Sequence, residues 1–543
     1  MLEPLRAALT EALRAAARER FDTGLEGIVL ERPPRIALGD LACPLAFDLA
    51  KTLKKAPRAI ATELAGALKL PAGVREARVE GAGYLNFFLD RGALVRSLLG
   101  GAAPSASRHE KVIVEHTNIN PNKAAHIGHL RNAVLGDVLV RALRRLGFEV
   151  EVQNYLDDTG VQVADVVAGL VHLRNVTTVE AARAAVAESR FPGEPVQPKG
   201  FAYLCWDLYA EVRRTYAANP ETKAWSDEVL HAIEAGNNET ARIAAIVVEA
   251  VSSAHLSTMG RLGIAYDLLP RESDILHKHF WARAFDMLKA SGAVHLETEG
   301  KHAGCWVLRL AASDEFAGME EPDKILVRSN GTVVYTGKDI AYQLWKFGLL
   351  GADFDYARFR PRWDSGAVEE GEIPAAVRSH PLWRTEHTGG DPSAPPFGRG
   401  RRVYNVIDVR QAYPQKVVRE GLRALGHPEE ADRSIHFSYE IVALSPGAAR
   451  ELAERFGEEY RLSPEDEKKA YVEMSGRKGL GVKADDLFEV LLERSRGEIA
   501  KRRGEEGVSG ADAAERDARA IAIGALRYFL LKVGRTKVIA FDF

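Results

Sequence analysis

The chain has 543 residues, enough for several domains of the usual ~100–200 residues. Hydrophobic residues make up 46% and charged residues 27%, as in proteins with a substantial core, and no apolar run approaches the ~20 residues that span a bilayer. The formal net charge of −3 gives no indication of a nucleic-acid partner. Cys43, Cys205 and Cys305 lie far apart, which excludes a disulfide framework and a CxxC zinc site and favours a reduced, cytoplasmic location.

Residues 1–105 predict a small N-terminal α+β domain. Leu2, Leu5, Leu9 and Leu13 recur at helical spacing between arginines, so an amphipathic helix is expected at the start rather than a signal peptide. The stretch PLAFDLAKTLKKAPRAIATELAGALKL is helical in pattern, and REARVEGAGYLNFFLD alternates as strands do. The Gly- and Ser-containing run 100–107 is predicted as a linker.

Residues 106–462 predict a parallel-sheet domain with helical insertions. KVIVEH (111–116) is typical of a buried strand, the range 120–148 has apolar positions every three or four residues, and EVEVQNYL (149–156) predicts the next strand. Strand, helix and strand joined by short connections form a βαβ unit with a right-handed crossover. The range 352–402 is rich in Pro, Gly, Trp and Arg and is expected to be a surface insertion, whereas 463–543 is predicted to be mostly helical.

The strongest local feature is His126-Ile127-Gly128-His129, preceded by Asn120-Pro121-Asn122-Lys123. It lies at the junction of the first predicted strand and the helix that follows. A helix N-terminus offers unpaired N–H groups and a partial positive charge, which suit phosphate. Gly128 permits close approach, and two imidazoles and a lysine can donate to phosphate oxygens. Helix-capping and surface histidines remain the alternative, because such a short pattern also arises by chance.

A second feature, Met474-Ser475-Gly476-Arg477-Lys478-Gly479, is a Gly-flanked loop with adjacent cations. Alone it is typical of a solvated turn; paired with the first feature it favours a phosphate clamp. His277 and His279 suggest a metal at first sight, but no cysteine or second histidine pair accompanies them at ligand spacing. We therefore expect no metal site in the protein.

Several blocks, in family order, resemble the arginyl-tRNA synthetases of class I: VEHTNINPNKAAHIGHLRNAVLGD, NYLDDTGVQ, VVYTGKDIAYQ, VIDVRQAYPQKVV, MSGRKG and the final GALRYFLLKVGRTKVIAFDF. GDLACPLAFDLAK and GAGYLNFFL resemble the additional N-terminal domain, which in the family contacts the tRNA elbow. The resemblance implies an α/β fold with a Rossmann-type catalytic domain over 106–462 and the start of a helical region at 463–543. Family chains continue into an anticodon-binding domain, so we expect a separate chain or missing segment to supply it and tRNA affinity to be weak without it.

The resemblance also implies an ATP site. In the family the HIGH histidines and the upstream lysine bind ATP phosphates, a role that falls to His126, His129 and Lys123. The family clamp reads Lys-Met-Ser-Lys-Ser, but here Glu473 and Gly476 replace its two lysines. Lys123 is expected to substitute, with Arg477 and Lys478 as the remaining cations of the loop. The implied ATP-binding set is Asn122, Lys123, His126, Gly128, His129, Met474, Ser475 and Lys478.

The implied arginine pocket consists of Glu115, Asn120, Tyr335, Asp339 and Gln411. A guanidinium is a planar, permanently charged fork of donors that carboxylates hold well. Glu115 and Asp339 would supply those carboxylates, Asn120 and Gln411 would hold the α-amino end, and Tyr335 would contact the side chain. The alternative for Asp339 is an ordinary helix cap before IAYQLWKF.

The implied reaction joins L-arginine to tRNA(Arg) through arginyl-adenylate, with ATP and Mg²⁺ and usually only when tRNA is bound. A non-catalytic tRNA-binding or regulatory relative is one alternative, with Glu473 and Gly476 as signs of decay. A HIGH-motif ligase for another amino acid is the other. The matched set of Lys123, His126, His129, Glu115 and Asp339 argues against the first alternative. The Tyr335–Asp339 pair and the additional N-terminal domain argue against the second.

Overall fold

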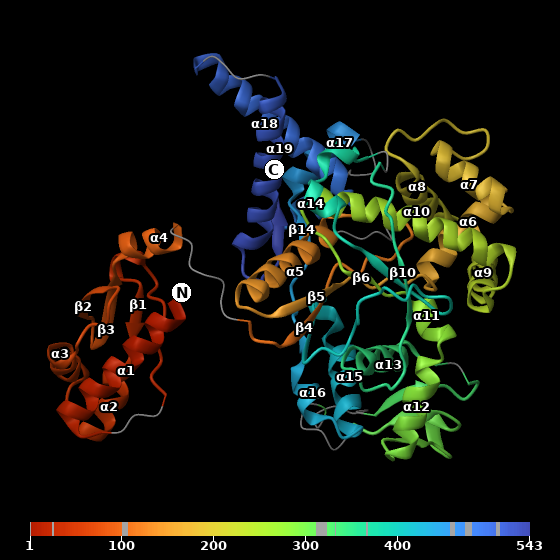
Figure 1. Cartoon of the computed structure of the whole chain (residues 1–543). Coiled ribbons are helices and arrows are strands. Elements are labelled where there is room, and N and C mark those ends of the chain that lie inside the picture. Colours follow the sequence, from red (N-terminus) through yellow and green to blue (C-terminus); the bar gives the residue numbers. More distant parts are fainter. Residues whose placement is uncertain are drawn as a thin grey trace. The chain divides into compact units, whose positions relative to one another are not determined.

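The computed structural model describes residues 2–23, 27–99, 107–310, 316, 323–331, 333–364, 367–456, 462–472, 481–506 and 511–542 (Figure 1). The chain divides into two compact units, Met1–Pro104 and Ser105–Phe543. Each unit has its own hydrophobic core and is described by itself.

The first unit is α+β, as predicted. Helix α1 (Leu2–Phe21) buries Leu9 and Leu13 against a three-stranded antiparallel sheet of order β1-β3-β2. Its strands are β1 (Leu41–Cys43), β2 (Val74–Glu80) and β3 (Tyr84–Leu89), and Leu85 and Phe87 of β3 are fully buried. Helices α2 (Leu45–Leu53), α3 (Pro57–Ala67) and α4 (Arg91–Leu99) complete the unit.

The second unit is built on a seven-stranded sheet of order β10-β11-β6-β5-β4-β12-β13. Every neighbouring pair is parallel except β10 with β11. The strands are β4 (Lys111–Glu115), β5 (Glu149–Gln153), β6 (Leu268–Leu269), β10 (Asp355–Arg358), β11 (Trp383–Glu386), β12 (Arg402–Asn405) and β13 (Ser434–His436). Helix α5 (Ile127–Arg145) joins β4 to β5, which confirms the predicted βαβ unit.

The strand order creates a switch point beside β4. The chain runs from β4 to β5 and β6 on one side, and β12 later adds on the other side. Connections from β4 and β12 therefore diverge at their carboxyl ends, which opens the crevice where parallel α/β sheets bind ligands.

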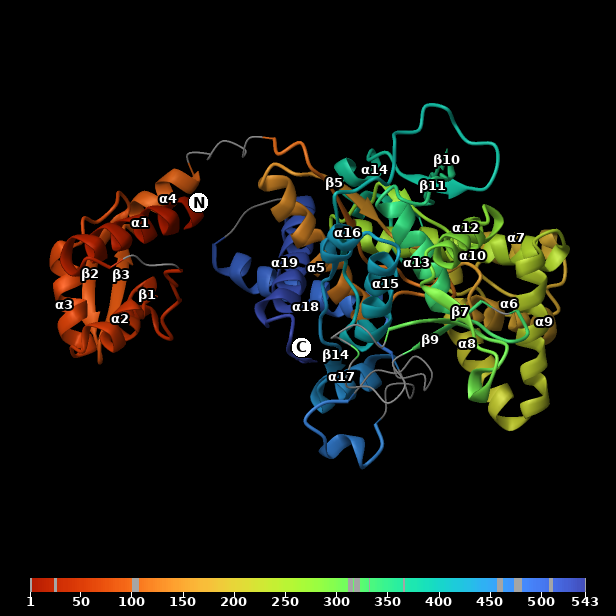
Figure 2. The same cartoon turned by 90° about the horizontal axis from the view of Figure 1, so that it is seen from below.

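A helical lobe is inserted between β5 and β6, as expected from the helical insertions predicted within 106–462; both views show it as one group (Figures 1 and 2). It consists of α6 (Val161–Arg174), α7 (Val179–Glu188), α8 (Phe201–Ala218), α9 (Ala224–Ala235) and α10 (Glu239–Arg261). By length and composition alone α10 is apolar enough to cross a membrane, but 72% of the window that meets this test is buried inside the fold. It therefore serves as a core helix of the lobe.

The range 352–402 requires a correction to the expected surface insertion. It supplies β10 and β11 to the main sheet, and Phe354, Trp383 and Phe397 are buried in the core beside them. The connections between these four-residue strands are rich in proline and glycine. Composition therefore indicated a surface segment and gave no sign that the aromatic residues are buried. A helix, α14 (Ala375–Arg378), lies between the two strands.

Between β6 and β10 the chain forms α11 (Glu272–His277), α12 (Phe280–Ala290) and α13 (Tyr335–Lys346), with a small antiparallel sheet of β7 (Val294–Leu296), β8 (Trp306–Leu308) and β9 (Lys324–Val327). Helices α15 (Ala412–Ala424) and α16 (Pro428–Arg433) connect β12 to β13.

The C-terminal elements pack onto the same sheet. They are β14 (Val442–Leu444), α17 (Pro446–Phe456), α18 (Ala484–Glu506), α19 (Ala511–Lys532) and β15 (Ile539–Phe541), and β14 pairs with β15 in parallel. Helix α19 lies beside α5 in both views (Figures 1 and 2). Leu526 and Phe541 share one buried cluster with Val112 of β4, so these elements belong to the core of the second unit.

Candidate active site

A cavity of about 430 Å³ lies at the switch point, at the carboxyl ends of β4 and β12. Five predicted site residues line it although they come from three separate parts of the chain: Glu115, Asn120, His129, Asp339 and Gln411. Residues that the sequence did not single out line it as well: Tyr155, Asp157, Tyr342, Gln343, Lys346 and Asn405. The parallel sheet brings these side chains together because it places successive strand ends at one edge.

The loop after β4 is held in a strained conformation. Thr117 and Asn118 have φ angles of 79° and 44°, in the region that side chains with a Cβ rarely adopt. Amide side chains fix this turn: the Thr117 N–H donates to Asn132 Oδ1 at 2.6 Å, and the Asn118 N–H donates to Asn154 Oδ1 at 2.9 Å. Asn132 also donates to the Val406 carbonyl at 2.8 Å, so α5 holds the ends of both β4 and β12.

Glu115 is already paired with a cationic side chain of the protein. The ammonium group of Lys346, at the end of α13, lies 2.5 Å from Glu115 Oε2, and the Asn118 side chain donates to Oε1 at 2.7 Å. Lys346 also donates to Asn405 Oδ1 at 3.0 Å and lies 4.3 Å from the centre of the Tyr342 ring. The charge of Glu115 is therefore balanced by Lys346, a partner that no local pattern indicated.

Asp339 is a half-buried acid with other acids nearby. Burial, followed by Glu272 and Glu115, raises the pKa of Asp339 to about 8. Burial, followed by Glu272 and Asp158, likewise raises the pKa of Asp157 to about 8. The cavity thus has a surplus of acidic groups. A bound cation would favour their charged forms.

The helix-cap alternative for Asp339 is wrong, because α13 begins at Tyr335 and Val334 holds the N-cap position. The Tyr335 side chain lies outside the described residues, so its predicted contact with arginine stays a prediction. The predicted clamp, with Met474, Ser475, Arg477 and Lys478, also falls in residues 473–480, outside the described part of the chain.

The two HIGH histidines form the start of α5. His126 is the N-cap; its Nδ1 accepts from the Gly128 N–H at 3.1 Å, and His129 Nδ1 accepts from the His126 N–H at 3.2 Å. Their rings stack with centres 3.6 Å apart. The capping alternative is therefore realised. Because each Nδ1 accepts, the neutral form of each ring carries its proton on Nε2, which can donate a hydrogen bond.

Burial also keeps both histidines neutral. It lowers the pKa of His126 to about 3, with Lys123 and His255 adding to the effect, and places the pKa of His129 well below its ordinary value. Lys123 is only 8% exposed, and burial lowers its pKa to about 8. Its ammonium lies 4.7 Å from the ring centre of Tyr209 and 5.7 Å from that of Trp206.

The segment that follows the clamp loop reaches the same place. Lys483 forms an isolated antiparallel bridge with His126, and the Ile127 N–H donates to the Val482 carbonyl at 3.1 Å. The Lys483 ammonium lies 5.3 Å from the centre of the Trp206 ring, so two lysines surround one indole beside the helix start. A cationic, donor-rich end thus adjoins the acidic cavity, and His129 lines that cavity.

Comparison with known proteins gives matches along the chain. Residues 3–89 match the family described as "Arginyl tRNA synthetase N terminal domain", and residues 93–353 match "tRNA synthetases class I (R), catalytic domain". The arginine–tRNA ligases of Deinococcus radiodurans and Thermococcus kodakarensis are 36% and 35% identical; each alignment covers 99% of this chain and 76% of the relative. The structure of Thermus thermophilus arginyl-tRNA synthetase aligns with a TM-score of 0.72 at 32% identity, over 99% of this chain and 77% of that one.

Proposed function

The chain belongs to the arginyl-tRNA synthetases of class I, and we propose that it activates L-arginine with ATP and transfers the arginyl group to the 3′-terminal adenosine of tRNA(Arg). One observation carries the assignment of the site: a cavity with surplus acid at one end adjoins a helix start with neutral imidazole donors and Lys123. That pairing suits a substrate with a cationic side chain next to a polyphosphate.

Arginine would lie in the cavity with its guanidinium towards Asp339. Because Lys346 neutralises Glu115, the guanidinium would be bound mainly by Asp339. Glu115 holds Lys346 and Asn118 in place. Asn120 and Gln411 would receive the α-amino group, and Tyr335 would contact the side chain. Asp157, which lines the cavity, would add a second carboxyl group on the acidic side. A neutral isostere of arginine would leave the acid unpaired and bind much more weakly.

ATP would lie across the start of α5 as its Mg²⁺ complex. His126 and His129 would donate from Nε2 to phosphate oxygens, and the helix N-terminus would add its partial positive charge. Burial lowers the pKa of Lys123, so a phosphate beside it would raise that pKa again. Asn122, Gly128 and the clamp residues Met474, Ser475, Arg477 and Lys478 would complete the site.

The chemistry is in-line displacement. A carboxylate oxygen of arginine attacks the α-phosphorus, the bond to the β-phosphate oxygen breaks, and pyrophosphate leaves. The terminal ribose hydroxyl of the tRNA then attacks the activated carbonyl carbon and AMP departs. Both steps depend on positioning and electrostatic stabilisation. A cavity formed by hydrogen-bonded loops and a capped helix suits this kind of catalysis. The location we propose is the cytoplasm, because all three cysteines are free and buried.

Amino-acid-dependent pyrophosphate exchange tests the proposal. We expect only arginine, of the twenty amino acids, to support exchange, and only when tRNA(Arg) is present. Exchange with another amino acid would assign a different ligase. No exchange with any amino acid, while tRNA still binds, would identify a non-catalytic relative.

A further inference from the structure

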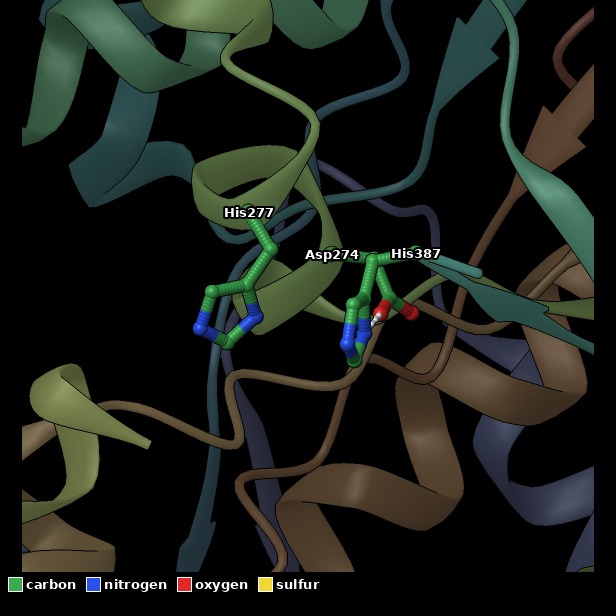
Figure 3. Close-up of side chains that lie close together, drawn as sticks. All are labelled: Asp274, His277 and His387. Atoms are coloured by element: carbon green, nitrogen blue, oxygen red, sulfur yellow. Dashed lines mark hydrogen bonds and ion pairs between the residues drawn. The ribbon is translucent and has the colours of Figure 1, made fainter. Parts of the chain in front are cut away.

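A second cluster of side chains, outside the cavity, combines two imidazoles and a carboxylate. Asp274 and His277 lie on α11, and His387 directly follows β11 (Figure 3). One ligand atom from each residue lies within 4.8 Å of the other two. The two histidine rings have centres 4.8 Å apart, and both residues are exposed while Asp274 is fully buried.

His387 Nδ1 and Asp274 Oδ1 form a long hydrogen bond, and their separation also fits two ligands of one metal ion. His387 Nδ1 lies 3.4 Å from Asp274 Oδ1, longer than the ~2.7–3.2 Å of an ordinary hydrogen bond. Two ligands at the ~2.0–2.2 Å bond lengths of a tetrahedral zinc ion stand roughly 3.4 Å apart. Asp274 and His387 therefore already have the spacing of two ligands of one ion.

Hydrogen bonds fix the orientation of the Asp274 carboxylate, as a metal-binding carboxylate requires. Its Oδ2 accepts from Thr385 Oγ1 at 2.6 Å and from Arg271 Nε at 3.0 Å, and Oδ1 accepts from the second Arg271 nitrogen at 3.2 Å. These contacts fix the direction of Oδ1 towards His387. Partners that orient a ligand in this way commonly raise metal affinity by about 10–100-fold.

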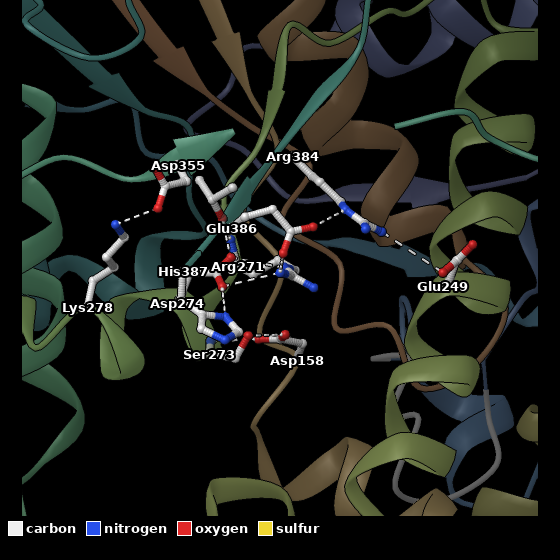
Figure 4. A network of polar contacts seen from close by, with 11 residues as sticks. Asp158, Glu249, Arg271, Ser273, Asp274, Lys278, Asp355, Arg384, Glu386 and His387 are labelled. Carbon is white, nitrogen blue, oxygen red and sulfur yellow. Dashed lines mark hydrogen bonds and ion pairs between the residues drawn. The ribbon is translucent and has the colours of Figure 1, made fainter. Parts of the chain in front are cut away.

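The surroundings favour an added cation in spite of Arg271. In the polar network around the cluster (Figure 4), five carboxylates face three cations, which leaves a formal charge of −2 while the histidines are neutral. The carboxylates are Asp158, Glu249, Asp274, Asp355 and Glu386, and the cations are Arg271, Lys278 and Arg384. A divalent ion would bring this network to neutrality.

His277 can complete the set by a small side-chain movement. A Cβ added at Gly236 would lie 3.3 Å from Nε2 of His277, and one of its ring nitrogens is among the three candidate ligand atoms. Figure 3 shows the ring turned towards that of His387. Because His277 is exposed at the end of α11, its rotation about χ1 and χ2 is not blocked by a packed core.

We propose that Asp274, His277 and His387 bind one borderline divalent metal ion, with Zn²⁺ as the preferred occupant. Imidazole and carboxylate ligands together suit Zn²⁺ rather than Mg²⁺ or Ca²⁺, which prefer oxygen alone. Three protein ligands leave a fourth position open to water. Sequence spacing could not indicate this site, because His387 is distant in the chain and His279 is not among the three ligands.

The test titrates the metal-free full chain with Zn²⁺ by calorimetry and with Co²⁺ by visible absorption. We expect one equivalent of each ion to bind and Co²⁺ to give the intense bands of a four-coordinate site. His277→Ala and His387→Ala should each weaken Zn²⁺ binding by about tenfold or more. His279→Ala, which removes a neighbouring exposed histidine, is the matched control and should bind as the wild type does.

Two results would overturn the site: a wild-type chain that binds no Zn²⁺, or His277→Ala and His387→Ala variants that bind it as tightly as wild type. Both substitutions are at exposed positions, so circular dichroism should show an unchanged fold. Asp274→Asn is a weaker test, because it also disturbs Arg271 and Thr385. Neither outcome bears on arginine-dependent exchange, which the cavity residues control.

Discussion

The carboxyl group of Asp339 shows how one half-buried residue can couple ligand binding to pH. Its pKa of about 8 means that the free protein holds a proton there near neutral pH. A guanidinium beside it favours the carboxylate and lowers that pKa. Arginine binding should therefore expel a proton below pH 8, and affinity should rise with pH, by up to about tenfold per pH unit, until it levels off above the pKa.

Calorimetry in two buffers of different ionisation enthalpy measures that proton directly. Asp157→Asn should keep the part of the release that belongs to Asp339, whereas Asp339→Asn should lose it together with most of the affinity. An arginine affinity that stays constant from acidic to basic pH, with no buffer dependence of the heat, would contradict the proposed role of Asp339.

His129 is predicted to act as a neutral donor. Its Nδ1 is engaged by the His126 N–H, so only the Nε2 proton is available to a phosphate oxygen. His129→Ala should lower the rate of arginine-dependent exchange by roughly 10²–10³ if that donor acts in the transition state. His129→Gln, which retains an N–H near the same position, should lose less. A wild-type rate in His129→Ala would remove this residue from the mechanism.

Single residues were predictable where a motif fixed both the residue and its place on an element. The sequence assigned Glu115, Asn120 and Asp339 to one site, and the structure places them around one cavity. It could not assign Lys346 to Glu115, because that contact depends on how α13 packs across the ends of β4 and β12. The same limit applies to pKa shifts, which depend on burial.

At the scale of elements, α5 fits closely against the strand end that it follows. A Cβ built on Gly136 of α5 would lie 2.3 Å from Cγ of His116, a fully buried ring. Gly136→Ala should therefore push α5 away from β4 and destabilise the protein by about 1–3 kcal/mol. Because α5 carries His126 and His129, the same variant should also slow exchange.

Gly524→Ala on α19 is the matched control for that prediction. It is also a helical glycine, but its added Cβ meets nothing within 4 Å, so alanine should stabilise the helix by up to about 1 kcal/mol. Thermal unfolding of the two variants should show melting temperatures shifted in opposite directions. Equal shifts would mean that the α5–β4 contact is looser than the structure indicates.

Elements were predictable from the sequence in proportion to their length and regularity. The five-residue strands β4 and β5 and the nineteen-residue α5 carry clear periodicity, and the βαβ unit followed from them. Strand β6 has only two residues, and β10 and β11 are separated by glycine- and proline-rich turns, so no period marks them. Their places in the sheet are fixed by long-range pairing.

At the scale of the whole molecule, a net charge of −3 conceals a separation of charge within the second unit. Acidic groups gather in the cavity, and Lys123 and Lys483 gather at the start of α5. Composition averages the two and gave no indication of a tRNA substrate. The motifs gave it only through their resemblance to the arginyl-tRNA synthetases.

The division into two units leads to the last prediction. The residues that line the cavity all belong to Ser105–Phe543, while Met1–Pro104 has a core of its own that includes Leu9, Leu13 and Phe87. A chain limited to 105–543 should therefore fold and bind arginine and ATP with affinities close to those of the full chain. Since the family's N-terminal domain contacts tRNA, the same chain should bind tRNA(Arg) more weakly.

Direct titration of arginine and ATP, beside filter binding of labelled tRNA(Arg), separates these effects without relying on exchange, which we expect to require tRNA. Isolated 1–104 should unfold cooperatively in urea, as expected of a unit with its own core. If arginine affinity fell as much as tRNA affinity when 1–104 is removed, both units would contribute to arginine binding. In that case the cavity of the second unit would be insufficient by itself.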